Sequence, residues 1–278
     1  MQILTRARRK AFDNIPPLNA TEQNCYLRID PKTRKVLRTL KTPETRVAYL
    51  VQRAYFLTKG RFFSPKDFDP KHIKIAAKSL GIRGDLSIES VTPRSLSRQK
   101  ELILDAHGWK PYSDERRKEV LGYANVLVDK QTHGEDILFA LVAFCWRYRI
   151  EIPGYNEFTD LISKAFQNFE EKTFVHMERC ITDHQKQLLL AILKNPPLGK
   201  KFGELKRIDQ STAQQALKSN AALLSFFRDV HTEIEDLLSE LNLTDEAIRY
   251  LATATINTGP NKIKRFETDD HLWLLDTE

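Results

Sequence analysis

The sequence predicts an all-α protein. Its 278 residues include only 10 glycines and 12 prolines, whereas sheet proteins use both residues in frequent turns. Apolar residues recur at helical spacing in successive segments, and most of these segments start at a capping residue and stop at a glycine. The content of 41% apolar and 29% charged residues permits a sizeable core and excludes disorder along the whole chain.

The first three predicted helices cover 43–57, 70–80 and 93–107. A capping residue followed by proline opens each of them, because proline suits the first turn, where its missing N–H is not needed. A glycine follows each of them and can take the left-handed conformation that ends a helix. Together they predict a first three-helix module.

The next three predicted helices cover 114–130, 135–147 and 156–180. The helix over 135–147 is apolar on most sides and should therefore lie centrally. The linker 147–155 joins it to a helix that begins after Pro-Gly, which is typical of a helix-turn-helix. Any three-helix bundle has the same parts, so this pattern by itself does not distinguish the two.

The rest of the chain is predicted to be a helical connector, with helices over 182–194, 211–241 and 244–255. The long amphipathic helix of this part carries a leucine-rich stripe on one side and acidic residues on its solvated face.

These patterns divide the chain into four parts. Residues 1–34 are polar, basic and broken by prolines, and we expect a basic arm that becomes ordered only against another surface. Residues 35–110 and 111–181 form tandem helix-turn-helix-like modules, and 182–278 form the connector.

Charge is distributed unevenly between the two ends of the chain. Residues 1–110 hold 23 Lys/Arg and 10 Asp/Glu, a net charge of +13, whereas the remainder has a net charge of −6. Such asymmetry indicates a polyanion partner for the first part, although a solvated basic surface would look the same. No apolar run approaches the ~18 residues that cross a bilayer, and we expect a cytoplasmic protein with no membrane partner.

The sequence offers no recognisable catalytic or cofactor motif. It contains no GxGxxG, P-loop or GxSxG pattern, and no two histidines are spaced i, i+4. His176 and Cys180 share a helix face, and the simplest interpretation is two residues of a partly buried helix. We therefore expect no enzyme activity, no cofactor and no metal in this chain.

Two predicted helix starts have the composition of a DNA-reading surface, since Arg, Gln, Asn, Ser and Thr on a helix read base edges. One lies at 92–100 and the other at 147–164. The candidate DNA-binding residues at these starts, in the arm and on the other basic helices are Arg6, Arg8, Arg9, Lys59, Arg61, Lys71, Lys74, Lys78, Arg94, Ser95, Arg98, Gln99, Lys100, Arg147, Arg149, Tyr155, Asn156, Thr159 and Lys164.

Five segments, in order, resemble the N-terminal part of the large transposases of replicative bacterial transposons, the Tn-three family. They are LTRARRKAFD at 4–13, RVAYLVQRAYFLTKGRFF at 46–63, the Arg/Glu-Leu-Ile/His-Gly-Trp pattern at 98–109, RIEIPGY at 149–155 and LTDEAIRY at 243–250. The resemblance covers nearly the whole chain.

This resemblance implies an all-helical region whose tandem helix-turn-helix modules bind the terminal inverted repeats of a transposon. Cleavage and joining of strands would belong to a larger C-terminal part with an RNase-H-like fold and a metal-binding Asp/Asp/Glu triad, which these residues do not contain. Self-association would occur through that part. The alternative is an all-helical protein-interaction or dimerisation module that does not bind DNA.

Overall fold

A computed structural model describes residues 3–84, 86–130 and 133–187, together with scattered positions between 225 and 248. The prediction of an all-α fold is confirmed: these residues form helices, and their only β-type pairing is an isolated parallel bridge between Lys110 and Ile150. Contacts divide the chain into two compact units, 1–166 and 167–278. The finer boundaries predicted from the sequence, at 34/35, 110/111 and 181/182, remain predictions.

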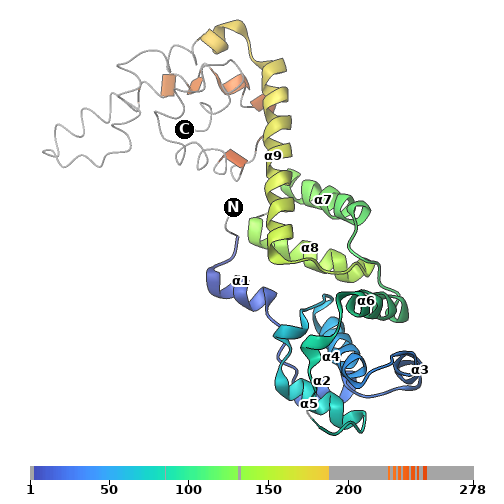
Figure 1. Cartoon of the computed structure of the whole chain (residues 1–278). Coiled ribbons are helices and arrows are strands. Elements are labelled where there is room, and N and C mark those ends of the chain that lie inside the picture. The colour runs from blue at the N-terminus through green and yellow to red at the C-terminus, as the bar shows by residue number, and fades with distance from the viewer. Residues whose placement is uncertain are drawn as a thin grey trace, which may run out of the picture. The chain divides into compact units, whose positions relative to one another are not determined.

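The helices of the first unit follow one another along the chain in Figure 1. They are α1 (Arg6–Asp13), α2 (Ala20–Tyr26), α3 (Pro31–Thr39), α4 (Pro43–Lys59), the short 3-10 helix η1 (Pro65–Asp67), α5 (Pro70–Ser79), the 3-10 helix η2 (Ile88–Ser90), α6 (Pro93–His107), α7 (Asp114–Asp129), α8 (Gly134–Tyr148) and the start of α9 (Tyr155–Cys180). The six helices predicted over 43–180 are therefore present, with ends that shift by a few residues.

The N-terminal segment differs from the expected arm because it folds into short helices. Asn19 caps α2 in a capping box with Glu22, and Asp30 caps α3 by accepting from the backbone N–H of Thr33. Leu18 and Leu27 are buried in the core. Helices of seven to nine residues are marginal alone, and it is this packing that stabilises them.

Helix α4 is the centre of the first module, and all residues from 47 to 56 are buried. One side of it packs with α2, α5 and η2 through Val51, Ala54 and Tyr55. Another side, which carries Tyr49 and Phe56, shares a core cluster with α3 and α6. A helix that is buried around its circumference has no face left for a ligand, so α4 itself is a scaffold.

The second group of helices in this unit is α7, α8 and the first part of α9. Val120 and Ala124 of α7, Leu141 of α8, and Phe158 and Leu161 of α9 are completely or almost completely buried. The apolar helix over 135–147 has one buried side, with Ile137 and Leu141 completely buried, whereas Phe139 and Trp146 on its other side are exposed. It is therefore buried on one side and not, as predicted, on most sides.

Backbone hydrogen bonds join the two groups of helices. Gly60, in the left-handed conformation with φ of 68°, ends α4 and accepts a 2.8 Å hydrogen bond from the N–H of Ile152. Lys110 donates to Arg149 O (2.7 Å) and accepts from the N–H of Glu151 (2.9 Å). The indole rings of Trp109 and Trp146 meet edge to face beside this junction. The linker predicted as a helix-turn-helix turn is therefore an extended strip paired to the first module.

In the second unit, the later part of α9 contributes Met177 to a small core with Leu237 and Leu241. Both leucines belong to the stripe of the amphipathic helix predicted over 211–241, of which the structure describes scattered helical residues from Ser225 onward. Most of the helices predicted over 182–194 and 244–255 lies outside the described residues.

Gly60 should tolerate alanine much less well than Gly81 does. Both glycines have a positive φ (68° and 67°), but a Cβ on Gly60 would lie 2.7 Å from Ile152 Cδ1, whereas a Cβ on Gly81 would meet nothing within 4 Å. We expect Gly81→Ala to cost about 1 kcal/mol from left-handed strain and Gly60→Ala about 2–4 kcal/mol, because overpacking is added. Urea unfolding followed by tryptophan fluorescence measures both, and equal losses would contradict the close approach.

Stability should fall in weak acid because of His72. Its Nδ1 lies 2.8 Å from the hydroxyl of Tyr55, which also accepts from the N–H of Asp69. Burial, the larger cause, and the charge of Lys71 lower the pKa of His72 against the opposing effect of Asp69. The contribution of neutral His72 to stability is therefore complete above about pH 6.5, the pKa of histidine in the unfolded chain. It is lost as the pH falls through the lowered pKa of the folded state. His72→Asn should flatten this part of the stability curve, and an unchanged slope would contradict it.

Candidate nucleic-acid interface

Helix α1 holds two of the predicted DNA-binding arginines in contacts within the protein. Arg8 pairs with Glu135 at 2.6 Å, and its guanidinium lies over the ring of Phe139. Arg9 donates to Asn156 Oδ1 at 2.8 Å and lies 5.2 Å from the centre of the Tyr155 ring. These contacts attach α1 to α8 and to the start of α9, so both arginines and Asn156 have partners without DNA.

Asp13 connects three parts of the unit through one carboxylate oxygen. Its Oδ1 accepts from Arg61 Nη1 at 2.7 Å and from the N–H of Tyr155, the first residue of α9, at 3.1 Å. An anion at a helix N-terminus is favoured by the helix dipole. Lys59 donates to Ala11 O at 3.2 Å, and burial followed by the charge of Arg61 lowers its pKa. Lys59 and Arg61 therefore serve the fold.

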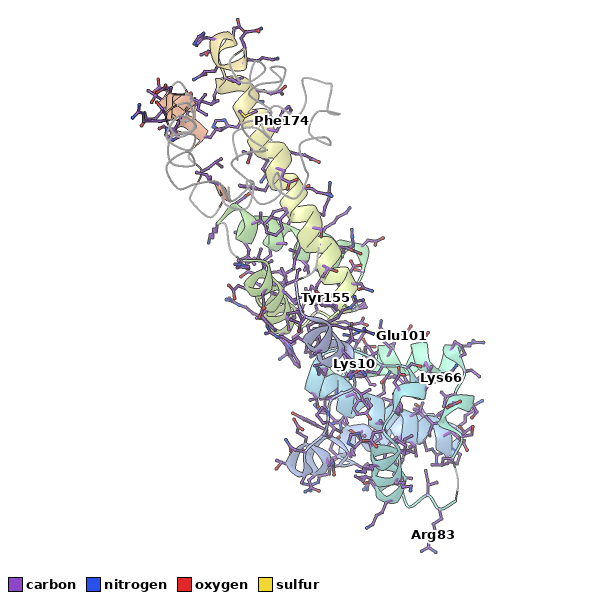
Figure 2. The ribbon with its side chains drawn as sticks, turned by 90° about the vertical axis from the view of Figure 1, so that its left-hand side faces the viewer. Lys10, Lys66, Arg83, Glu101, Tyr155 and Phe174 are labelled. Atoms are coloured by element: carbon purple, nitrogen blue, oxygen red, sulfur yellow. The ribbon has the colours of Figure 1, made fainter. Side chains whose placement is uncertain are left out.

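Tyr155 and Thr159 are a correction to the predicted DNA-reading set. The Tyr155 side chain is 3% exposed and its hydroxyl accepts from the N–H groups of Ile3 (3.2 Å) and Leu4 (2.9 Å). Thr159 is 9% exposed and donates to Asn156 O. Figure 2 shows Tyr155 at the beginning of α9. At the start of α9, therefore, Tyr155 and Thr159 are not available for reading bases.

Gln99 is a second correction. It is 1% exposed, and its Nε2 donates to Thr45 O at 3.0 Å, so it anchors α6 to the start of α4. The next residue, Lys100, pairs with Glu151 at 2.6 Å and lies over the ring of Phe62. Gln99 and Lys100, which were predicted to bind DNA, therefore hold α6 in place.

Arg94 and Arg98 of α6 remain available for a ligand. Both side chains are exposed, and neither forms an ion pair with any residue that the structure describes. Thr92 caps the helix by accepting from the N–H of Ser95, and the two hydroxyls lie 3.0 Å apart. The first two turns of α6 thus present two arginines beside small hydroxyl groups, with the buried Gln99 fixing the helix beneath them.

The three lysines of α5 form a second exposed group. Lys71, Lys74 and Lys78 follow at i, i+3 and i+7 on the face away from the buried His72 and Ala76. No ion pair engages them among the described residues. Beyond α5, Arg83 extends away from the rest of the protein (Figure 2).

The remaining predicted residues are spread over the first unit. Arg6 is exposed on α1, and Lys164 is exposed on α9. Arg147 lies over the ring of Tyr148. Arg149 has φ of 53° and caps α8, while its guanidinium donates to His107 O at 3.4 Å. The structure therefore does not bring the second predicted group together as a single basic surface.

Sequence reasoning missed the basic character of α3 and its flanks, because the predicted boundary between the arm and the first module, at 34/35, divides this helix. The segment carries six exposed cations that form no ion pair within the described residues: Arg28, Lys32, Arg34, Lys35, Arg38 and Lys41. We call them the α3 cationic face. The available signal was the sequence PKTRKVLRT, in which an acidic cap and proline precede basic residues around two buried positions.

The described residues contain no cluster of three or more His, Cys, Asp or Glu side chains that could hold a metal ion. His176 Nδ1 and Cys180 Sγ lie 3.9 Å apart on α9, and His176 Nε2 lies 3.3 Å from Glu240 O. Burial raises the pKa of the Cys145 thiol to about 12, which makes it a poor nucleophile. Across the same part of the chain, no helix is long and apolar enough to span a bilayer.

The sequence of the first unit matches a known family model. The model described as a domain of unknown function, DUF4158, matches residues 3–165. The chain belongs to the DUF4158 family. The matched residues coincide closely with the first compact unit, so the DUF4158 domain includes α1 to α8 and the beginning of α9. A comparison with curated proteins found no match.

Asp13→Asn should destabilise the DUF4158 domain more than Glu135→Gln does. The Asp13–Arg61 pair has side-chain exposures of 37% and 16%, and the Glu135–Arg8 pair has 36% and 52%. Loss of the Asp13 charge leaves a largely buried guanidinium with a weaker acceptor, and we expect a loss of about 1–3 kcal/mol. The exposed pair should cost at most about 1 kcal/mol. Urea unfolding measures both changes, and a larger effect at Glu135 would contradict this assignment.

Proposed function

We propose that this chain is the end-recognition part of a transposase of the Tn-three family and that its DUF4158 domain binds double-stranded DNA. The sequence resemblance suggests the transposase, and the excess of cations in residues 1–110 supports a polyanion partner. The observation that carries the proposal is the start of α6, where Arg94 and Arg98 are exposed and unpaired within the described residues.

Base reading is assigned to α6 rather than to α9. Arginine side chains in the first turns of a helix can enter the major groove and bind guanine with two hydrogen bonds. The start of α9, which the tandem helix-turn-helix hypothesis would also place on DNA, has Tyr155 and Thr159 buried. The lysines of α5 carry charge without a recognition pattern and are proposed as phosphate contacts.

The competing function is an all-helical interaction module whose leucine stripe docks on another chain. Leu237 and Leu241 of that stripe are 1% and 8% exposed and pack with Met177 inside the second unit. Since these two positions are already covered by the chain itself, the stripe gives this alternative little support.

The direct test is DNase footprinting on the ends of the transposon that encodes the chain, together with selection of binding sites from a random duplex pool. We expect protection of the terminal inverted repeats. If about six phosphates are neutralised, affinity should drop about a thousandfold or more between about 50 and 200 mM salt. A tight dimer with no affinity for any duplex would instead favour the interaction module.

Arg94→Gln and Arg98→Gln should reduce discrimination between the selected site and random DNA, because each would remove contacts to base edges worth about 1–3 kcal/mol. Lys74→Gln, at an exposed position of α5, should weaken binding to both duplexes equally. Gel-shift titration with the two duplexes measures the ratio of affinities. Equal losses on both duplexes for Arg94 and Arg98 would remove them from base reading.

A further inference from the structure

The α3 cationic face keeps its positive charge because the only carboxylate between residues 28 and 43 is already bonded to other groups of the fold. That carboxylate is Asp30: its Oδ1 accepts from the N–H of Thr33 at 2.7 Å, and its Oδ2 pairs with Arg53 at 3.2 Å. Arg53 is buried beneath α3 and donates to Tyr26 O as well. Among the described residues, no acidic side chain forms an ion pair with any of the six exposed cations.

The fold itself gives no use for this concentration of charge. Elsewhere in the unit, exposed cations such as Arg8 and Arg117 have carboxylate partners, Glu135 and Glu157. On α3, Lys32, Lys35 and Arg38 repel one another, and this repulsion lowers stability until a polyanion binds.

Two ligand classes could relieve this repulsion, an anionic membrane and a nucleic acid. A membrane-binding helix needs an apolar face that enters the lipid. The apolar side of α3 is already used, because Leu37 is 5% exposed and packs with Tyr49 and Ile103 in the protein core. A purely cationic face on a fixed helix is suited to the phosphates of a duplex.

Two hydrogen bonds attach the end of α3 and the first half of α6 to the same first turn of α4. Leu40 O, just after α3, accepts from Arg46 Nε at 2.9 Å, and Thr45 O accepts from Gln99 Nε2 of α6 at 3.0 Å. Leu37 of α3 and Ile103 of α6 also belong to one core cluster. Figure 1 shows α3 and α6 on the same side of α4, away from α5.

We propose that α3 binds backbone phosphates of the same duplex whose bases α6 reads, and thereby supplies affinity that does not depend on sequence. This inference rests on the proposed function and adds a second element to its interface. The nine residues of α3 span about 14 Å, or about four base steps of duplex. One strand carries one phosphate per base step, so the helix is long enough to pass about four phosphates of one strand.

The test compares Lys35→Gln/Arg38→Gln with the charge-matched control Lys118→Gln/Lys130→Gln on α7 and its C-cap, all in the full chain. Each pair changes exposed side chains and removes two charges, and glutamine keeps helix propensity close to that of lysine and arginine. The probes are a random duplex of about three helical turns and the selected site, titrated across a salt series. Lys35→Arg, which keeps the charge, should bind like the unmodified chain.

We expect the α3 pair to lose about tenfold or more affinity for both duplexes and to lower the slope of log K against log salt by about 1.8, or 0.9 for each phosphate lost. The specificity ratio should not change. The control pair should leave affinity and slope as they are. Unchanged binding by the α3 pair overturns the inference but leaves the proposed function intact.

Two further outcomes would overturn it differently. A loss confined to the selected site would make α3 a base-reading element, contrary to the phosphate role. If the unmodified chain binds no duplex but binds phosphatidylserine-containing vesicles through Lys35 and Arg38, then both the inference and the proposed function fail.

Discussion

The pairing of Gly60 with Ile152 is the constraint on which the first unit depends. The glycine ends α4 with a positive φ, and its carbonyl accepts a 2.8 Å hydrogen bond from the N–H of Ile152. A Cβ at this position would lie 2.7 Å from Ile152 Cδ1. Because of this close approach, the linker after α8 runs along the end of α4, and Lys110 can pair with the same linker. Two groups of helices that could have been independent modules are thereby joined by backbone hydrogen bonds, which hold regardless of side-chain conformation.

Around this junction, cations are used to build the protein. Arg61, Lys59 and Lys100 each bond to a carboxylate or a carbonyl group from another element. Arg61 and Lys100 also lie over aromatic rings. Such groups contribute to stability and are poorly placed to contact a ligand. Away from the junction, the lysines and arginines of α3 and α5 and the two arginines at the start of α6 face solvent, and they form no ion pair within the part of the chain that the structure describes. The cations bonded within the protein and the exposed cations without ion pairs therefore lie in different places. This arrangement supports the proposed interface more strongly than the net charge does.

Much of the fold could be predicted from local sequence. The helices α4, α5 and α6 begin at a capping residue followed by proline and are followed by glycine, and these are signals that act within one turn. The helix α3 has the same kind of start, Asp30 followed by Pro31, but no glycine ends it. The helices α1 and α2 lack this pattern, and they are short and stabilised by distant residues. Thr5 caps α1 locally, but Phe12 packs against Tyr155 and Phe158, which are more than a hundred residues away in the chain.

The sequence by itself determined the all-α class, the helix starts and stops of the central part, and the basic character of the first 110 residues. Only the tertiary structure decided which basic and polar residues are available. Gln99 and Arg98 are adjacent in the chain, yet one is 1% exposed and bonded to Thr45 O while the other faces solvent. Propensity and capping act between near neighbours, whereas burial and ion pairing depend on which distant elements meet, and that is settled when the helices pack.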